Sequence, residues 1–243
     1  MPRKDKMIIH GISKLTLLDY PGHTACTLFT GACSFRCPFC QNSGLVLDPD
    51  REPVIDPDWL FSFLEKRKHL LQGVCISGGE PTLHRDLPDF IRRIREMGYM
   101  VKLDSNGYEP EILDQLLREH LIDAAAMDIK SSPLNYRKAA GMEDKPFDFS
   151  RIRTSAELLM NYGRTDSDFY CEFRTTMVRG LQTEEDMALI GEWLAGAPRY
   201  FLQHFEDEGK VLKPGLQAMT AEEMEKMAAV IRPHIPHTEL RGI

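Results

Sequence analysis

The sequence predicts an α/β fold built on a parallel sheet. Three observations support this prediction: short apolar or β-rich runs alternate with helical stretches, residues suited to chemistry follow the apolar runs, and no repeat or low-complexity tract interrupts the order. Alternating strand and helix patterns indicate βαβ units, whose strands pair in parallel. We expect six such units, which could form an open doubly wound sheet or an incomplete barrel.

The first units show the pattern. A strand is expected at residues 24–30, and after a loop a helix follows at residues 57–68. Asp56 can cap this helix, and Pro57 suits its first position because that position needs no backbone N–H. A second strand is expected at residues 73–77.

The next helix, residues 87–97, has apolar residues at helical spacing and a glycine, Gly98, as its stop. Its apolar face consists of Leu87, Phe90, Ile91 and Ile94. The later strands are expected at residues 100–104, 124–128, 169–177 and 199–202. The later helices are expected at residues 111–119, 149–162, 183–194 and 221–231.

Composition narrows the class of protein. The chain has 243 residues, 42% hydrophobic and 28% charged, which excludes disordered and collagen-like classes. Its net charge of −7 argues against a nucleic acid as partner. No apolar run reaches the roughly 18 residues of a membrane span, and the first residues lack the apolar stretch of a signal peptide. We therefore expect a cytoplasmic protein with no membrane partner, in a compartment where structural disulfides are rare.

Residues suited to chemistry follow four of the predicted strands. A cysteine cluster follows the first strand, and Gly78 and Gly79 follow the second. Asp104 ends the third strand, and Asp128 and Lys130 end the fourth. Since the carboxyl ends of parallel strands meet at one edge of a sheet or barrel, this pattern predicts a single site.

The chain has six cysteines, and three of them, Cys33, Cys37 and Cys40, share one loop. The others lie in apolar runs and are expected to be buried small hydrophobes. These are Cys26, Cys75 and Cys171.

The cysteine loop could bind zinc or an iron–sulfur cluster. Zinc sites often use cysteines two residues apart, but they usually add a second such pair or histidines, and His23 precedes the strand. A [4Fe–4S] cluster with three thiolates keeps one iron open for a substrate or cofactor. The ligand type and number favour iron–sulfur over zinc.

The spacing Cys33-x3-Cys37-x2-Cys40, with Phe39 before the last cysteine, resembles the cluster loop of the radical S-adenosylmethionine (radical SAM) superfamily. The sequence Gly-Gly-Glu-Pro at residues 78–81 resembles its second signature. Residues 14–22 and 29–31, and the sequence CPFCQN at residues 37–42, are similar to glycyl radical enzyme activating proteins, especially the activating protein of anaerobic ribonucleoside-triphosphate reductase. Many members have histidine where this chain has Gln41.

The resemblance implies a partial (β/α)6 barrel of the TIM type, made of one radical SAM domain over residues 1–243. Its core is expected at residues 22–205, with a C-terminal helix and tail at residues 206–243. It implies one [4Fe–4S] cluster on Cys33, Cys37 and Cys40.

The resemblance also implies S-adenosylmethionine as cofactor. Asp104 and Asp128 could bind a monovalent cation, order Lys130, or be ordinary strand-end carboxylates, and His204 could contact the ribose or be a core or surface histidine. The cofactor contacts implied are Phe39, Cys40, Gln41, Gly78, Gly79, Glu80, Asp104, Asp128, Lys130, Arg174 and His204.

The function implied is an activase that makes a 5′-deoxyadenosyl radical and removes a hydrogen atom from a glycine of a partner glycyl radical enzyme. The partner expected is anaerobic ribonucleotide reductase, and the electron donor expected is reduced flavodoxin or ferredoxin. One alternative is a radical SAM enzyme acting on a small molecule, such as 7-carboxy-7-deazaguanine synthase. The other is a non-catalytic iron–sulfur or zinc protein, which leaves residues 78–81 and Lys130 without a role.

Overall fold

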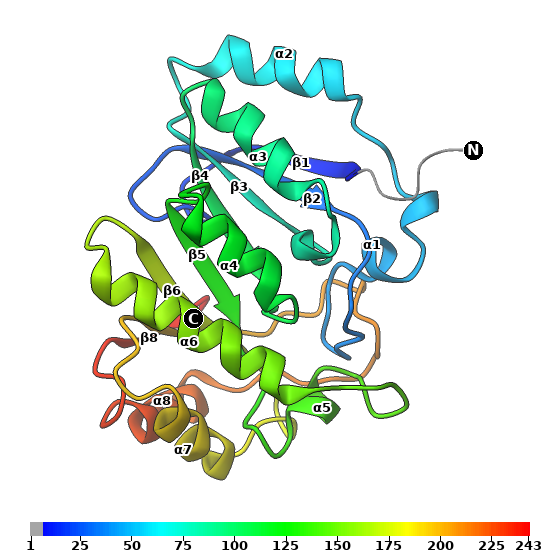
Figure 1. The fold of residues 1–243 in the computed structure, drawn as a ribbon. Helices are drawn as coiled ribbons and strands as arrows, with labels where there is room; N and C mark the ends of the chain where they lie inside the picture. The colour runs from blue at the N-terminus through cyan, green and yellow to red at the C-terminus, as the bar shows by residue number, and fades with distance from the viewer. Residues whose placement is uncertain (1–6) are drawn as a thin grey trace.

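The computed structural model describes residues 7–243 and contains one eight-stranded sheet in the order β1 to β8 (Figure 1). Strand β1 is antiparallel to β2, and every later neighbour pairs in parallel. The sheet begins at β1 and ends at β8, so it forms an incomplete barrel. This confirms the predicted α/β fold and its partial-barrel form.

All six predicted strands are present, as β2 to β7, and two more were not predicted. Strand β1 mixes buried, half-buried and exposed residues, and β8 has only four residues, so neither makes an apolar run. Both lie outside residues 22–205 and extend the same sheet. The strands are β1 (Ile9–Thr16), β2 (Ala25–Thr30), β3 (Gly73–Gly78), β4 (Met100–Ser105), β5 (Ala124–Asp128), β6 (Tyr170–Met177), β7 (Tyr200–His204) and β8 (Thr238–Arg241).

The predicted helices are present, and their ends follow the capping residues. The Asp56 side chain accepts a hydrogen bond from the Trp59 N–H at 2.8 Å, as an N-cap should. Two short helices, α1 and α5, were not predicted. The helices are α1 (Ser43–Leu47), α2 (Pro57–Arg67), α3 (Leu87–Glu96), α4 (Pro110–Arg118), α5 (Tyr136–Ala139), α6 (Phe149–Thr165), α7 (Glu184–Trp193) and α8 (Ala221–Ile231). Among residues 7–243, the helices are too short or too polar to cross a membrane.

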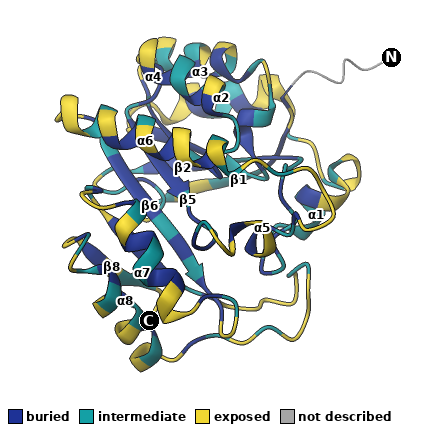
Figure 2. Cartoon of the chain, turned by 60° about the horizontal axis from the view of Figure 1, so that its bottom comes forward, coloured by how far each residue is buried: buried dark blue, intermediate teal, exposed yellow. Residues whose placement is uncertain are grey.

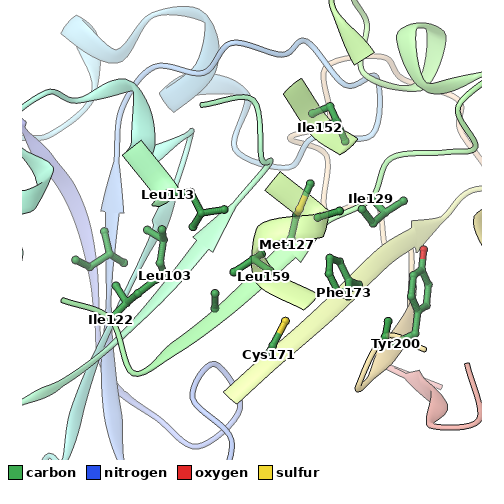
Figure 3. Packing of buried hydrophobic residues seen from close by; sticks show 14 of the residues in the cluster. Leu103, Leu113, Ile122, Met127, Ile129, Ile152, Leu159, Cys171, Phe173 and Tyr200 are labelled. Atoms are coloured by element: carbon green, nitrogen blue, oxygen red, sulfur yellow. The ribbon is translucent and has the colours of Figure 1, made fainter. Parts of the chain in front are cut away.

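The apolar core lies between the strands and the helices that cover them. Leu113 of α4 and Leu159 of α6 lie over Leu103, Met127 and Phe173 of the strands, and all five are buried (Figure 3). Figure 2 shows the same division, with buried strands and with helices that expose one face. Burying each such side chain stabilises the fold by about 1.5–3 kcal/mol. The prediction that Cys26, Cys75 and Cys171 are buried is confirmed.

Strand residues alternate between this core and the barrel interior. On β4, the apolar Leu103 stands between Lys102 and Asp104, and on β6 Phe173 stands between Glu172 and Arg174. Because successive strand side chains point to opposite faces, the charged residues face inward. The interior of this barrel is therefore polar, and it leads to the carboxyl ends of the strands.

Candidate active site

A cavity of about 330 Å³ lies at the carboxyl ends of the strands. It is bounded by the cysteine loop after β2 and by the ends of β3 to β7. All the site residues expected from the sequence line it: Cys33, Cys37, Phe39, Cys40, Gln41, Gly78, Gly79, Glu80, Asp104, Asp128, Lys130, Arg174 and His204.

The cysteine loop is anchored by aromatic packing and by backbone hydrogen bonds. The ring of Phe35 is buried and lies 5.4 Å from Tyr108, edge-on, and 6.1 Å from Phe147. The Arg36 N–H donates to the Ala140 carbonyl at 2.9 Å. These contacts fix the loop while its three thiols line the cavity.

Burial raises the pKa of the Cys33 thiol to about 11 and that of Cys37 to about 12, although the charge of Lys130 opposes this rise. The pKa of Cys40 is raised for the same reason. These raised pKa values favour the protonated thiols at neutral pH, and a metal bound there would supply the positive charge that favours the thiolates. Among residues 7–243, no three His, Cys, Asp or Glu side chains converge as they would on a single metal ion.

Gly78, at the end of β3, and Gly79 pack against the end of β2 and the start of the cysteine loop. A Cβ on Gly79 would lie 1.8 Å from the Ala32 carbonyl oxygen, and one on Gly78 would lie 2.3 Å from the Thr30 nitrogen. Gly78 also has a φ of +119°, which residues with a Cβ rarely adopt. The atoms that these Cβ atoms would meet are protein backbone, so the missing side chains let the turn pack closely against the chain at residues 30–32.

Glu80 is buried, and its carboxylate is fully engaged within the protein. Its Oε1 accepts hydrogen bonds from the Thr82 N–H at 3.1 Å and the Ser105 hydroxyl at 2.9 Å. Its Oε2 accepts from the Asn106 N–H at 2.6 Å. Burial raises the pKa of this carboxyl group even though these hydrogen bonds oppose the rise. Glu80 therefore joins the glycine turn to the end of β4.

Asn106 is a site residue that the sequence reasoning missed. Its side-chain amide donates to the Ser34 hydroxyl at 3.0 Å and lies 3.7 Å from the Cys33 sulfur. Asn42 was also missed, and its amide donates to the Gly78 carbonyl at 3.1 Å. The position of Asn106, directly after a predicted strand, was the available signal.

A buried charge network lies beside the thiols. The Arg174 Nε is 2.7 Å from an Asp128 oxygen, and its Nη1 is 3.2 Å from an Asp104 oxygen. Lys130 pairs with Asp128 at 3.1 Å, and Lys102 pairs with Asp104. Burial alone would raise the pKa of both carboxyl groups, but these cations outweigh it and hold both pKa values low.

The network continues to buried Glu172, which lies 4.0 Å from the Arg174 Nη1 and pairs with Arg241 at 2.8 Å, so the cations beside the thiols are matched by carboxylates. The Lys130 ammonium lies 5.8 Å from the centre of the Phe39 ring, so it is next to the cysteine loop. Lys130 and Arg174 both line the cavity, and their charged N–H donors can bind an anionic ligand.

His204, at the end of β7, and Gln41, just after Cys40, complete the lining of the cavity. The Nδ1 atom of His204 is buried and has no hydrogen-bond partner among the described residues. A buried polar atom without a partner is costly, so it indicates a group that a ligand can satisfy. The Gln41 side-chain amide donates to the Glu206 carbonyl, which directs it toward the loop after β7.

Comparisons with known proteins agree with this geometry. The family model described as Radical SAM superfamily matches residues 27–194, and the chain belongs to that superfamily. Within it, the chain is 30% identical over 207 residues to a Methanocaldococcus jannaschii protein named as a glycyl-radical enzyme activating enzyme. That match covers 83% of this chain and 81% of the relative. The resemblance inferred from the motifs is therefore confirmed.

Solved structures show the same fold. A domain of pyruvate-formate lyase-activating enzyme from Bacteroides vulgatus has a TM-score of 0.52 at 22% identity, covering 70% of this chain and 99% of that one. SuiB of Streptococcus suis, bound to S-adenosylmethionine, has a TM-score of 0.62 at 15% identity, covering 87% of this chain and 48% of that one.

Membership of the superfamily implies an enzyme with a [4Fe–4S] cluster and S-adenosylmethionine, and the residues present fit both groups. Three thiols from one loop line the cavity, so a cluster held there would keep one iron open. The lining cations Lys130 and Arg174 suit a carboxylate, and the unpartnered nitrogen of His204 suits a hydroxyl.

Proposed function

We propose that this protein activates a glycyl radical enzyme and that its partner is an anaerobic ribonucleoside-triphosphate reductase. The observation that carries the proposal is the convergence of Cys33, Cys37 and Cys40 with Lys130 and Arg174 on one cavity. The similarity to the M. jannaschii protein over most of both chains supports the same assignment. The similarity of residues 15–42 to reductase activating proteins supports that partner.

In this proposal Cys33, Cys37 and Cys40 hold the cluster, and each residue around it has a separate task. Lys130 and Arg174 hold the carboxylate of S-adenosylmethionine by charge-assisted hydrogen bonds. Asp104 and Asp128 keep these two cations in place. Phe39 lies against the adenine, with the backbone of Cys40 and Gln41 nearby, and His204 contacts the ribose. Gly78, Gly79 and Glu80 form the turn that bounds the cavity.

When bound, the cluster and S-adenosylmethionine supply reductive cleavage to methionine and a 5′-deoxyadenosyl radical, which removes a hydrogen atom from a glycine Cα of the partner. The chain itself has to bind and orient S-adenosylmethionine and to exclude water, and no side chain has to move a proton. The buried, fully paired charges of the cavity suit this task, because they orient a ligand without offering a free acid or base.

A monovalent cation at Asp104 and Asp128 would have to compete with the protein's own cations. Lys102, Lys130 and Arg174 already pair with both carboxylates. We therefore propose that these side chains neutralise the two carboxylates, and that activity is the same in potassium and sodium buffers of equal ionic strength.

We propose reduced flavodoxin or ferredoxin as the electron donor. We also propose that the chemistry takes place in the cytoplasm, because the cluster and the free thiols of this chain need a reducing compartment.

The proposed function is tested by anaerobic reconstitution followed by reduction with dithionite. The protein is expected to bind about four irons per chain and to release 5′-deoxyadenosine from S-adenosylmethionine. With the reductase added, an electron paramagnetic resonance doublet from a glycyl radical is expected, and it should vanish when the partner's glycine is replaced by alanine.

Lys130→Ala tests the ligand contact separately from the cluster. It should weaken S-adenosylmethionine binding about tenfold or more and leave the iron content unchanged, because its proposed partner is a carboxylate. Lys66→Ala is the matched control, since Lys66 is exposed on α2. Stimulation of 5′-deoxyadenosine release by a small purine or pterin, without a protein radical, would instead assign the enzyme to a small-molecule substrate.

A further inference from the structure

A second hollow, of about 590 Å³, lies against the outer side of the cysteine loop. We call it the outer groove. Figure 1 shows the loop after β2 in blue beside α5 and the orange segment that follows β7. Two hydrogen bonds fix this contact, from the Arg36 N–H to Ala140 and from the Lys213 N–H to Pro38. The groove is lined by Arg36, Pro38, Leu47, Lys138, Gly141, Glu143, Arg179, Gly180, Leu181, Leu212, Lys213 and Leu216.

The wall between the cavity and the outer groove is a single stretch of chain. Phe35, Cys37 and Phe39 are buried and line the cavity. The residues between them, Arg36 and Pro38, are half-buried and line the groove. The backbone on both sides of Cys37 therefore forms part of the groove, so a molecule bound there lies close to a proposed cluster ligand.

The outer groove is basic on a chain whose net charge is −7. It contains Arg36, Lys138, Arg179 and Lys213 against one acid, Glu143. Lys138 and Lys213 are exposed, and among residues 7–243 neither forms an ion pair.

The other two cations are engaged within the protein. Arg179 pairs with Glu223 at 2.6 Å. The Arg36 guanidinium donates to the carbonyls of Cys33 at 2.6 Å and Phe35 at 2.7 Å, so it supports the loop. The two lysines are therefore the charges free to meet a partner.

We propose that the outer groove binds the acidic face of the one-electron donor protein, so that the electron enters through the loop at Cys37. This inference rests on the proposed function. The glycine of the partner enzyme has to enter the cavity, whereas a donor only has to come close, because electron transfer weakens steeply with distance. Free lysines around apolar Leu181 and Leu212 suit an acidic protein surface. In this step the donor loses one electron, the cluster gains it, and no bond forms or breaks.

The test is the double variant Lys138→Glu/Lys213→Glu, compared with the wild type using two reductants. With reduced flavodoxin as donor, release of 5′-deoxyadenosine should need about tenfold or more flavodoxin to reach half its maximal rate, and the wild type's salt dependence should be lost. With dithionite, which needs no docking surface, the rate should equal that of the wild type.

The matched control is Lys66→Glu/Lys68→Glu, which changes the net charge equally. Both control residues are exposed near the end of α2, away from the outer groove. This control should behave as the wild type with both reductants. If the flavodoxin-dependent rate fell equally in the two double variants, only net charge would matter, and the outer groove would not be the docking surface.

Direct binding of oxidised flavodoxin at low ionic strength separates this proposal from the proposed function. If the groove variant binds oxidised flavodoxin as tightly as the wild type does, the outer groove is not the docking surface, whatever the activity of the variant. If the wild type does not cleave S-adenosylmethionine with dithionite, the proposed function is wrong. The binding comparison still shows whether the outer groove binds the donor. If dithionite-driven cleavage is normal and only glycyl radical formation is lost, the groove binds the partner enzyme instead.

Discussion

Gly79→Ala is the substitution that most directly tests how the site is built. A Cβ at this position would lie 1.8 Å from the Ala32 oxygen, so the two segments would have to separate by at least about 1.2 Å to reach even a 3.0 Å contact. Such overpacking costs about 1–3 kcal/mol. It would also strain the 2.8 Å hydrogen bond from the Glu80 N–H to Ala32, which is worth about 1 kcal/mol.

The expected loss of unfolding free energy is therefore about 2–4 kcal/mol. Since Ala32 directly precedes Cys33, the displacement should also reach the cluster loop, and we expect lower iron content or about tenfold weaker S-adenosylmethionine binding. Anaerobic urea unfolding followed by circular dichroism measures the stability. Iron analysis and a binding titration of the reconstituted protein measure the site.

Gly11→Ala is the matched control. Gly11 also has an ordinary φ, and its added Cβ would meet nothing closer than 3.4 Å, so stability and binding should change little. If Gly79→Ala left the unfolding free energy, the iron content and the S-adenosylmethionine affinity as in the wild type, the packing argument would be refuted.

Three further predictions follow from single contacts. Glu80→Gln should cost about 1–2 kcal/mol in urea unfolding, because an amide NH₂ would replace the oxygen that accepts from the Asn106 N–H, and unchanged stability would contradict this. Cys37→Ala should lose the iron, whereas Cys171→Ala should keep it and lose only stability, so iron loss in the latter would overturn the ligand assignment. Burial would raise the pKa of Asp186, but hydrogen bonds to its carboxylate outweigh this and lower it. Asp186 therefore stabilises the fold above its unfolded pKa of about 3.9, and the stability difference between wild type and Asp186→Asn should shrink as the pH falls below about 4, whereas a constant difference would refute the assignment.

The residues of the site could be predicted from the sequence because the strand topology brings most of them together. Residues that end parallel strands meet at one edge, so Asp104, Asp128, Arg174 and His204 could be placed together without knowing any distance. The cysteine spacing was informative for a similar reason, because three ligands on one loop need no tertiary information.

What could not be predicted depends on contacts between segments far apart in the chain. Gly78 and Gly79 lie against the backbone of Thr30 and Ala32, respectively, and no local sequence pattern reveals these contacts. A lysine in an apolar strand, such as Lys102, is ordinarily expected at the surface. In the structure it is buried in the barrel interior, paired with Asp104. The role of Asn106 in the site is evident only from the structure, which places its side-chain amide beside the Cys33 sulfur.

Residues 14–22, which contributed to the family resemblance, lie away from the site. They form the last residues of β1 and most of the connection to β2, at the amino ends of the parallel strands. Tyr20 is buried there, and a Cβ on Gly73 would lie 2.8 Å from its ring. Tyr20 therefore packs at the end of the barrel opposite the cavity, which indicates a structural role for this run.

The alternation along the strands separates stability from function in this protein. Leu103 and Phe173 face the helices and stabilise the fold, whereas their neighbours Asp104 and Arg174 face the cavity. A buried ion network contributes little net stability, because desolvation of the charges offsets their attraction. Its value here is to hold Lys130 and Arg174 in fixed positions before any ligand arrives. Charges that are fixed in advance need no reorganisation when a ligand binds, so the cost of ordering this site is met when the chain folds.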